Sequence, residues 1–404
     1  MELFTQNLTN HKIKHNKIEN VLILFFNLIN NADNYVKNKR KDNYLTHTIN
    51  KINNINDIPK SSMNNSYLFP NEIQQYINNN SLYNINFNCK IKGRLINVDF
   101  IIFNKMSNNS LSIINNQIHM IFMWIYILQQ YSLKKCSKYI NLFVYFTPFT
   151  KILPNNRLTS INSTNVNSGF TTGCKEFTEI VLYRTEEWFK VFIHETFHNF
   201  GLDFSDINLY TTDKKLKEIF NLNIEYNLYE SYCETWARIW NTLFYSYFAV
   251  PYTIKPNSTM FISNFYKNIK IEAQHSLIQM LKILQFHDLN YSTITNKQPS
   301  NITICNHLYS EQTSVFSYYI ITSLLINNFD LFIIWCDINN NNIIQFKKTP
   351  NNLDKYIELI KKFEYNKHLK NNINKIEKSF IKNKEHIDDN LKMTYINMYD
   401  VFEK

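Results

Sequence analysis

Glycine is scarce in this sequence, with four residues in 404, and proline contributes eight. So few glycines form no phosphate-binding glycine loop, which argues against the common nucleotide-binding motifs. Three of the four, Gly169, Gly173 and Gly201, fall between positions 169 and 201. Glycine adopts left-handed backbone without steric cost, so a chain this poor in glycine is expected to keep it where the backbone requires it.

Cysteine-pair motifs and targeting signals are also missing. The six cysteines, at positions 89, 136, 174, 233, 305 and 336, form no C-x-x-C pair. This pattern argues against a zinc finger and favours free thiols in a reducing compartment. The first residues, Met1 to Asn7, lack the charged-then-apolar pattern of a secretory signal. We therefore expect an intracellular protein.

Long hydrophobic runs are absent as well. The most apolar stretch, Ile118 to Leu128, is shorter than the roughly 20 residues that a membrane span needs. Residues 312–329 are uncharged but carry Ser, Thr, Gln and Asn, so a buried helix is predicted there. The sequence therefore predicts no transmembrane segment.

Asparagine, isoleucine, lysine, tyrosine and phenylalanine dominate the composition, as AT-rich codons would produce. The composition resembles proteins of large AT-rich DNA viruses or of some intracellular parasites, and a viral source would place the protein in host cytoplasm or in the virion. The net charge of +10 is spread along the chain and is consistent with codon bias. A basic surface can attract nucleic acid, but no RNA-recognition motif is present, so no specific nucleic-acid partner is expected.

One run, His194-Glu195-Thr196-Phe197-His198, has the pattern H-E-x-x-H. Residues four apart share a face of a helix, so His194 and His198 can hold one metal ion. Glu195 lies beside them, where it can take a proton from a water at the metal. The run predicts a catalytic site with one zinc ion, Zn2+, and Glu195 as the general base.

The residues around the motif favour a buried helix of about 15 residues. Thr185 is the predicted N-cap, the glutamates at 186 and 187 suit the positive end of a helix, and Gly201 suits its end. The alternative interpretation is a core helix that carries two histidines by chance. Two imidazoles and a carboxylate in an apolar helix need partners to offset their burial, which favours the metal site.

A catalytic zinc usually has a third protein ligand. The position that would extend the motif is Phe204, which cannot bind a metal, and Asp203 stands one place early. Farther on, a helix is predicted over 225–248, and on it Glu230 and Glu234 share a face. We predict Glu234 as the third ligand, with Glu230 and Asp203 as alternatives.

These motifs resemble the zincin metallopeptidases, and within them the gluzincins, which follow an H-E-x-x-H helix with a glutamate ligand on the next helix. Glu234-Thr235-Trp236-Ala237 is similar to the E-x-x-A pattern of several members, the catalytic domain of anthrax lethal factor among them. Many gluzincins carry an acid four residues after the ligand, which supports a ligating histidine. With Glu234 as ligand that place is Arg238, which could instead pair with Glu234 on a surface helix. Asp203, Asp206 or a backbone carbonyl is then expected to support the histidine.

The resemblance covers residues 85–248 and implies a fold. We predict an α+β fold, with a zincin-like unit of twisted mixed sheet and active-site helix over 85–250. A mostly helical region, 1–84, precedes it, with an asparagine-rich loop at 39–66, and a helical C-terminal lobe, 251–404, follows it. The predicted order within the unit is strand Cys89–Leu95, strand Asn97–Phe103, helix Ile113–Tyr131, strand Tyr139–Thr147, glycine loop, strand 179–184 and the motif helix.

The resemblance also implies two substrate contacts. The last strand would be the sheet edge that holds an extended substrate by backbone hydrogen bonds, through Val181, Leu182 and Tyr183. The alternative is a central strand with no free edge. A tyrosine or histidine of the C-terminal lobe would steady the oxyanion, and the candidates are Tyr318, Tyr319 and His307.

The sequence thus predicts a zinc-dependent peptidase that acts on a peptide or protein substrate. One alternative is a non-catalytic, zincin-like structural or virion-associated protein. Another is a basic nucleic-acid-binding protein, whose binding would weaken steeply with salt.

Overall fold

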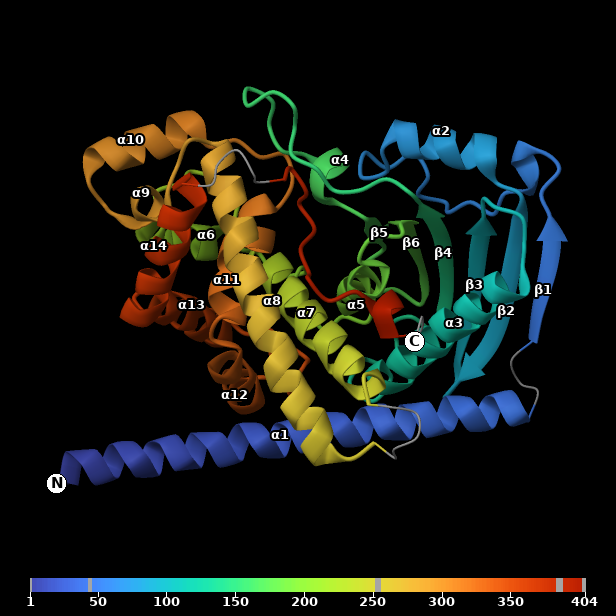
Figure 1. Cartoon of the computed structure of the whole chain (residues 1–404), viewed down its shortest axis with the longest axis horizontal. Coiled ribbons are helices and arrows are strands. Elements are labelled where there is room, and N and C mark those ends of the chain that lie inside the picture. The colour runs from blue at the N-terminus through green and yellow to red at the C-terminus, as the bar shows by residue number, and fades with distance from the viewer. Residues whose placement is uncertain (1, 43–45, 251–255, 383–387, 402–404) are drawn as a thin grey trace.

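The computed structural model describes residues 2–42, 46–250, 256–382 and 388–401. The fold mixes helices and strands: a six-stranded mixed sheet fills one half of the molecule, and helices fill the other (Figure 1). The helix that carries the H-E-x-x-H motif lies between the two halves.

The sheet has the strand order β1-β2-β3-β4-β6-β5. Neighbouring strands are antiparallel at the two ends of this order, whereas β3, β4 and β6 run parallel. The strands are β1 Thr46–Lys51, β2 Tyr83–Ile91, β3 Arg94–Ile102, β4 Tyr139–Thr147, β5 Gly169–Thr171 and β6 Phe177–Arg184. The β2–β3 hairpin, β4 and β6 were predicted, and β4 has the predicted bounds.

The N-terminal region belongs to the same body as the sheet. Helix α1 (Glu2–Lys41) packs against α3 (Asn108–Leu128), α7 (Leu228–Phe248) and α8 (Ser258–Phe286). The asparagine-rich stretch 39–66 is not only a loop, because it contains β1, a short 3₁₀ helix at Ile55–Asp57 and the end of α1. The predicted boundary at residue 84 falls inside β2.

Alternating side chains of the strands fill two apolar layers. One face of the sheet packs on α3 and on the motif helix α5 (Trp188–Asn199), within the main core. The other face is covered by α2 (Asn71–Asn80) and the segment before it, where Phe69 stacks on Tyr183. The two layers pack the two faces of β6, and the main core also packs the motif helix, so both elements lie in a rigid frame.

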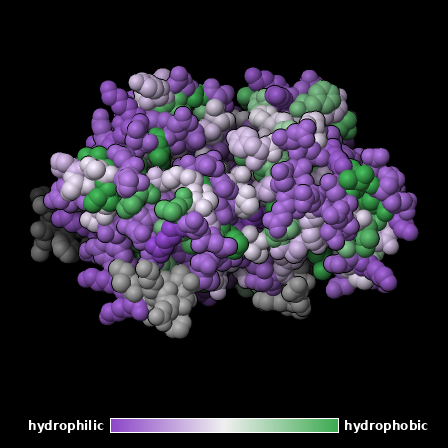
Figure 2. All heavy atoms as spheres, turned by 90° about the horizontal axis from the view of Figure 1, so that it is seen from above, coloured by the Kyte–Doolittle hydropathy of each residue, from purple (hydrophilic) through white to green (hydrophobic). Residues whose placement is uncertain are grey.

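Helix α3 is long and apolar enough to cross a membrane by length and composition. However, 67% of its most apolar window is buried inside the protein, and Trp124 on it donates to the hydroxyl of Thr196 in α5 at 2.7 Å. Such burial is typical of a core helix. The molecular face shown in Figure 2 is mostly hydrophilic, with small apolar groups.

After residue 256 the described chain is almost entirely helical. The elements of this part are α8, α9 Tyr291–Thr295, α10 Pro299–Leu308, the π-helix η2 Phe316–Ile321, α11 Thr322–Ile326, α12 Phe329–Asn339, α13 Pro350–Glu364, α14 Lys367–Lys382 and the 3₁₀ turn η4 Met398–Val401. Before η4, residues 388–397 form an extended segment (red) that crosses the middle of the molecule between its two halves (Figure 1). Helices α4 Ser163–Val166 and α6 Tyr210–Ile219 complete the fold.

The expectation of six free thiols is wrong for two of them. Cys136 and Cys174 form a disulfide, whereas the cysteines at 89, 233, 305 and 336 are free and buried. The fold brings the segment before β4 beside the β5–β6 connection, a proximity that sequence spacing does not reveal. Both cysteines contact the space at Gly201, where an added Cβ would lie 3.3 Å from each.

Candidate metal centre and catalytic cleft

Helix α5 begins and ends with left-handed backbone. Glu187, with φ 59°, precedes the helix and offers no side-chain cap, and Gly201, with φ 68°, follows it as predicted. The predicted N-cap, Thr185, instead donates its hydroxyl to the carbonyl of Thr147 at 3.1 Å. The helix has 12 residues, and its motif residues are buried apart from His198, which is partly exposed.

Three donor atoms converge on one point beside α5. The Nε2 atoms of His194 and His198 lie 3.2 Å apart, and the carboxylate of Glu230 lies 3.0 Å from the first and 3.5 Å from the second. Glu230 comes from the first turn of α7, which packs across α5. The burial and chemistry of these three side chains match a group that could hold a metal ion.

The donor set fits zinc. Zinc binds imidazole nitrogen and carboxylate oxygen at about 2.0–2.2 Å in a tetrahedron, which places neighbouring ligand atoms about 3.3 Å apart. The three distances given above surround this value. The imidazoles hold the pKa of Glu230 well below its usual range although burial opposes ionisation. A metal ion would replace the imidazole protons that cause this shift, since histidine binds a metal only when its ring is neutral.

Glu234, the predicted third ligand, does not face this point. Its carboxylate contacts Nδ1 of His194 at 3.1 Å, Nζ of Lys190 at 3.0 Å and Nε of Arg238 at 3.0 Å. Glu230, which the sequence offered as an alternative third ligand, lies beside the two Nε2 atoms instead. Because the Glu234 carboxylate accepts a hydrogen bond from Nδ1–H of His194, the lone pair of Nε2 is left free to bind a metal. Arg238 does pair with Glu234, but inside the protein and not on an exposed face.

His198 has an equivalent support. Its Nδ1 lies 2.7 Å from Asp203, which is buried and is one of the residues predicted for such a role. Asp203 is therefore not placed as a third ligand. Asp206, another candidate for the supporting role, is exposed and pairs with Lys348. The Sγ atom of Cys233 also lies 3.8 Å from Nδ1 of His198.

Glu195 and the three donors line a cleft of about 490 Å³. Burial raises the pKa of Glu195 above its usual value, which suits a carboxylate that must take up a proton near neutral pH. Tyr229, whose ring lies 6.1 Å from that of His198, also lines the cleft. Tyr229 was not predicted as a site residue, although it directly precedes the candidate ligand Glu230 in the sequence.

The prediction that 179–184 is an edge strand is wrong. Val181, Leu182 and Tyr183 lie in β6, which pairs with β4 on one side and with β5 on the other. The edge is β5, three residues within the predicted glycine loop. Gly169 starts β5 and requires the absence of a side chain, because a Cβ there would lie 2.8 Å from the carbonyl of Val181 and 2.9 Å from Val191 in α5.

β5 borders the cleft with free backbone groups. The carbonyl of Ser168 accepts from Tyr183, and the amide of Thr172 donates to Glu179, so these alternate residues face β6. In an antiparallel ladder, the residues between them direct their backbone groups the other way. Gly169 and Thr171, which both line the cleft, therefore present unpaired groups to an extended chain.

Of the three predicted oxyanion residues, one reaches the cleft. The ring of Tyr318 lies 5.8 Å from that of His194, and Tyr318 lines the cleft with Glu195. Burial raises the pKa of Tyr318 well above its usual value, so its hydroxyl remains a hydrogen-bond donor. Tyr319 instead donates to the carbonyl of Leu391, and His307 is exposed on α10.

Two buried lysines lie beside the site and were not predicted from the sequence. Lys190 precedes His194 by one turn of α5 and pairs with Glu234, and Lys151 pairs with Glu187 at 2.8 Å. All four side chains are buried. A single lysine inside the apolar run Trp188–Ile193 was a signal, because a buried ammonium requires a carboxylate partner.

Glu311 is expected to make stability depend on pH. It accepts from the Tyr309 hydroxyl and from the amide of Phe316, at the start of the π-helix that carries Tyr318, and burial raises its pKa to about 8. From pH 5 to 8 the unfolded chain ionises this carboxyl while the folded protein keeps it protonated. The free energy of unfolding should therefore fall as pH rises through this window, by a few kcal/mol at most.

The variant Glu311→Gln should be less sensitive to pH, because an amide cannot ionise. Urea unfolding at pH 5, 6.5 and 8 compares the two proteins. The variant is expected to gain stability relative to the wild type as pH rises. Parallel pH profiles would show that Glu311 ionises equally in both states.

Comparison with known proteins gives no relative: no family model matches the chain, and no curated protein or solved structure shows significant similarity to it.

Proposed function

We propose that this protein is a zinc-dependent peptidase of the zincin type, with His194, His198 and Glu230 as ligands. The observation that carries the proposal is the triangle of two Nε2 atoms and one carboxylate, with Glu195 beside it in a cleft. The edge strand β5 along the same cleft supports a peptide substrate, because its free backbone groups match an extended chain.

The spacing on α7 adds support for the gluzincin resemblance. Gluzincins often carry an acid four residues after the glutamate ligand, and with Glu230 as ligand this acid is Glu234. Glu234 contacts Nδ1 of His194, which is the contact expected of such a residue. With Glu234 as ligand, Arg238 would stand where many gluzincins have this acid; with Glu230 as ligand, the sequence matches the gluzincin pattern at this position.

The chain's own residues divide the proposed reaction among them. A bound zinc ion would supply a positive charge that polarises the scissile carbonyl and acidifies water. Gly169 and Thr171 hold the substrate backbone, and Glu195 takes a proton from the attacking water. Glu195 then passes this proton to the leaving amine. Tyr318 donates its hydroxyl to the oxygen on which negative charge develops.

Removal of metal is expected to abolish peptide cleavage. A proteome-derived peptide mixture is incubated with the protein, and new termini are identified by mass spectrometry. Treatment with a chelator should end cleavage, and zinc, but not magnesium, should restore it, because magnesium prefers oxygen ligands. Cleavage that survives with no metal bound would contradict the proposal, and zinc-loaded protein that cleaves nothing would favour a non-catalytic zincin-like protein.

A further inference from the structure

The extended segment before η4, residues 388–397, forms part of the wall behind the proposed site. Its backbone pairs with the chain that follows β4: the amide of Leu391 donates to the carbonyl of Lys151, and the amide of Leu153 donates to that of Asp389, both at 2.9 Å. On its other side, the hydroxyl of Tyr319 donates to the carbonyl of Leu391 at 2.7 Å. The segment is thus bound along both sides.

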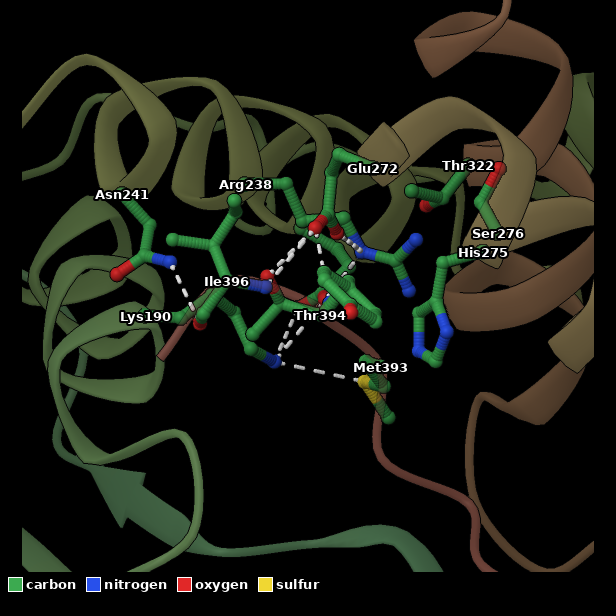
Figure 3. A network of polar contacts seen from close by, with 12 residues as sticks. Lys190, Arg238, Asn241, Glu272, His275, Ser276, Thr322, Met393, Thr394 and Ile396 are labelled. Carbon is green, nitrogen blue, oxygen red and sulfur yellow. Dashed lines mark hydrogen bonds and ion pairs between the residues drawn. The ribbon is translucent and has the colours of Figure 1, made fainter. Parts of the chain in front are cut away.

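Two buried carboxylates, one in α8 and one directly before α5, fix Thr394 and Tyr395. Glu272 in α8 accepts from the Thr394 hydroxyl at 2.8 Å (Figure 3). It also accepts from the Tyr395 amide at 2.9 Å. Glu187 accepts from the amide of Thr394. These contacts leave little freedom to Met393, whose Sδ lies 3.5 Å from Nζ of Lys190 (Figure 3).

Met393 lines a small chamber next to the catalytic cleft. The chamber and the cleft share walls at His194, Glu195 and Tyr318. Its volume is about 30 Å³, which is enough for one or two water molecules. The walls that belong to the chamber alone are Lys151, Val166, Ser168, Lys190, Val191, Glu234 and Met393.

Both ammonium groups of the chamber wall already pair with carboxylates: Lys151 with Glu187 at 2.8 Å and Lys190 with Glu234 at 3.0 Å. An anionic substrate side chain would lose its hydration there without a new partner, which is costly. A cationic one would pair with Glu195, the wall carboxylate that must stay available for the proton of the attacking water. A large side chain would have to displace Met393, which the hydrogen bonds of the neighbouring residues hold in place.

We infer that the chamber accepts the side chain of a substrate residue next to the scissile bond, and that Met393 limits the size of this side chain. The substrate residue at this position is then small and uncharged, such as glycine, alanine or serine. This inference rests on the proposed peptidase function. Met393 belongs to the C-terminal segment and lies 199 positions after His194, which lines the same chamber. The H-E-x-x-H motif itself therefore does not encode this preference.

The test compares Met393→Ala with Met393→Leu, which keeps the volume, and with Met398→Ala, a buried methionine outside the chamber. Each zinc-loaded protein cleaves peptides that carry alanine or leucine at either position next to the scissile bond. Wild type, Met393→Leu and Met398→Ala should prefer alanine at one of these positions. Met393→Ala should shift the leucine-to-alanine ratio of kcat/KM there by about 10- to 200-fold toward leucine.

Binding supplies a second readout that does not need turnover. In the Glu195→Gln background, Met393→Ala should shift the affinity for the same peptides in the same direction, measured by fluorescence anisotropy. Equal use of leucine and alanine at both positions by the wild type would overturn the inference while leaving the peptidase proposal intact. So would an unchanged ratio in a folded Met393→Ala. Zinc-loaded wild type that neither binds nor cleaves any peptide would overturn both.

Discussion

Replacing Glu195 with glutamine is expected to lower kcat by about 10²–10⁴-fold, the usual contribution of a general acid–base group, and to leave zinc bound. The amide has nearly the same shape as the carboxylate but cannot take up a proton. Glu195 lines the cleft beside the two histidines and is not one of the three converging donors. Initial rates of peptide cleavage, measured together with zinc content, check this expectation.

Glu218→Gln provides the matched control, because Glu218 is an exposed glutamate on α6. This variant should keep the wild-type rate, since neutralising one exposed carboxylate far from the reacting atoms changes the potential there only slightly. A Glu195→Gln protein that binds zinc and retains full activity would refute the assigned role of Glu195.

Substitutions of the two glutamates on α7 should have different effects on zinc. Glu230→Gln removes a proposed ligand and is expected to leave the protein without zinc after dialysis. Glu234→Gln removes only the support of His194, and losses of this kind weaken metal binding by about 10–100-fold. Zinc content after dialysis and zinc affinity by competition with a chelating dye measure both effects.

The free energy of unfolding should fall more in Glu234→Gln than in Glu230→Gln, the reverse of the order expected for zinc loss. Glu230 contacts the two imidazoles, whereas Glu234 pairs with the buried cations Lys190 and Arg238. Loss of one partner of a buried ion pair costs about 3–5 kcal/mol, so Glu234→Gln should unfold at markedly lower urea concentration than Glu230→Gln. If Glu234→Gln loses zinc while Glu230→Gln keeps it, the ligand assignment is reversed.

The motif helix and the central strands could be predicted from the sequence because their signals are local. β4 is a continuous β-branched and aromatic run, and Gly201 ends α5 with the left-handed backbone that only glycine adopts easily. The start of the helix was harder to locate. Thr185 has the residue type of an N-cap, but the left-handed residue Glu187 directly precedes the helix, and its carboxylate pairs with Lys151, which is distant in sequence.

The third ligand required tertiary information. Glu230 and Glu234 share one face of α7, so helical periodicity predicts both equally well. The crossing of α7 over α5 decides between them, because it places Lys190 against the second carboxylate and the two Nε2 atoms against the first. The sequence signals for this choice are Lys190, one turn before His194, and Arg238, one turn after Glu234, because both cations pair with Glu234.

The sheet edge and the disulfide depended on topology in the same way. β5 has three residues, too few for a strand pattern, and its pairing with β6 converts the predicted edge into an interior strand. Cys136 and Cys174 are 38 residues apart and come together only when β4 lies beside β6. The role of Met393 in the chamber wall likewise appears only once the C-terminal segment is placed.

The most direct test of the proposed metal centre is the metal content of the purified wild-type protein, measured by mass spectrometry after dialysis against metal-free buffer. Three converging donors with buried supports should retain about one zinc per chain. A His194→Ala protein measured beside it should retain none. Wild-type protein that holds no zinc, even after zinc is added and the excess removed, would contradict the metal centre and the peptidase proposal with it.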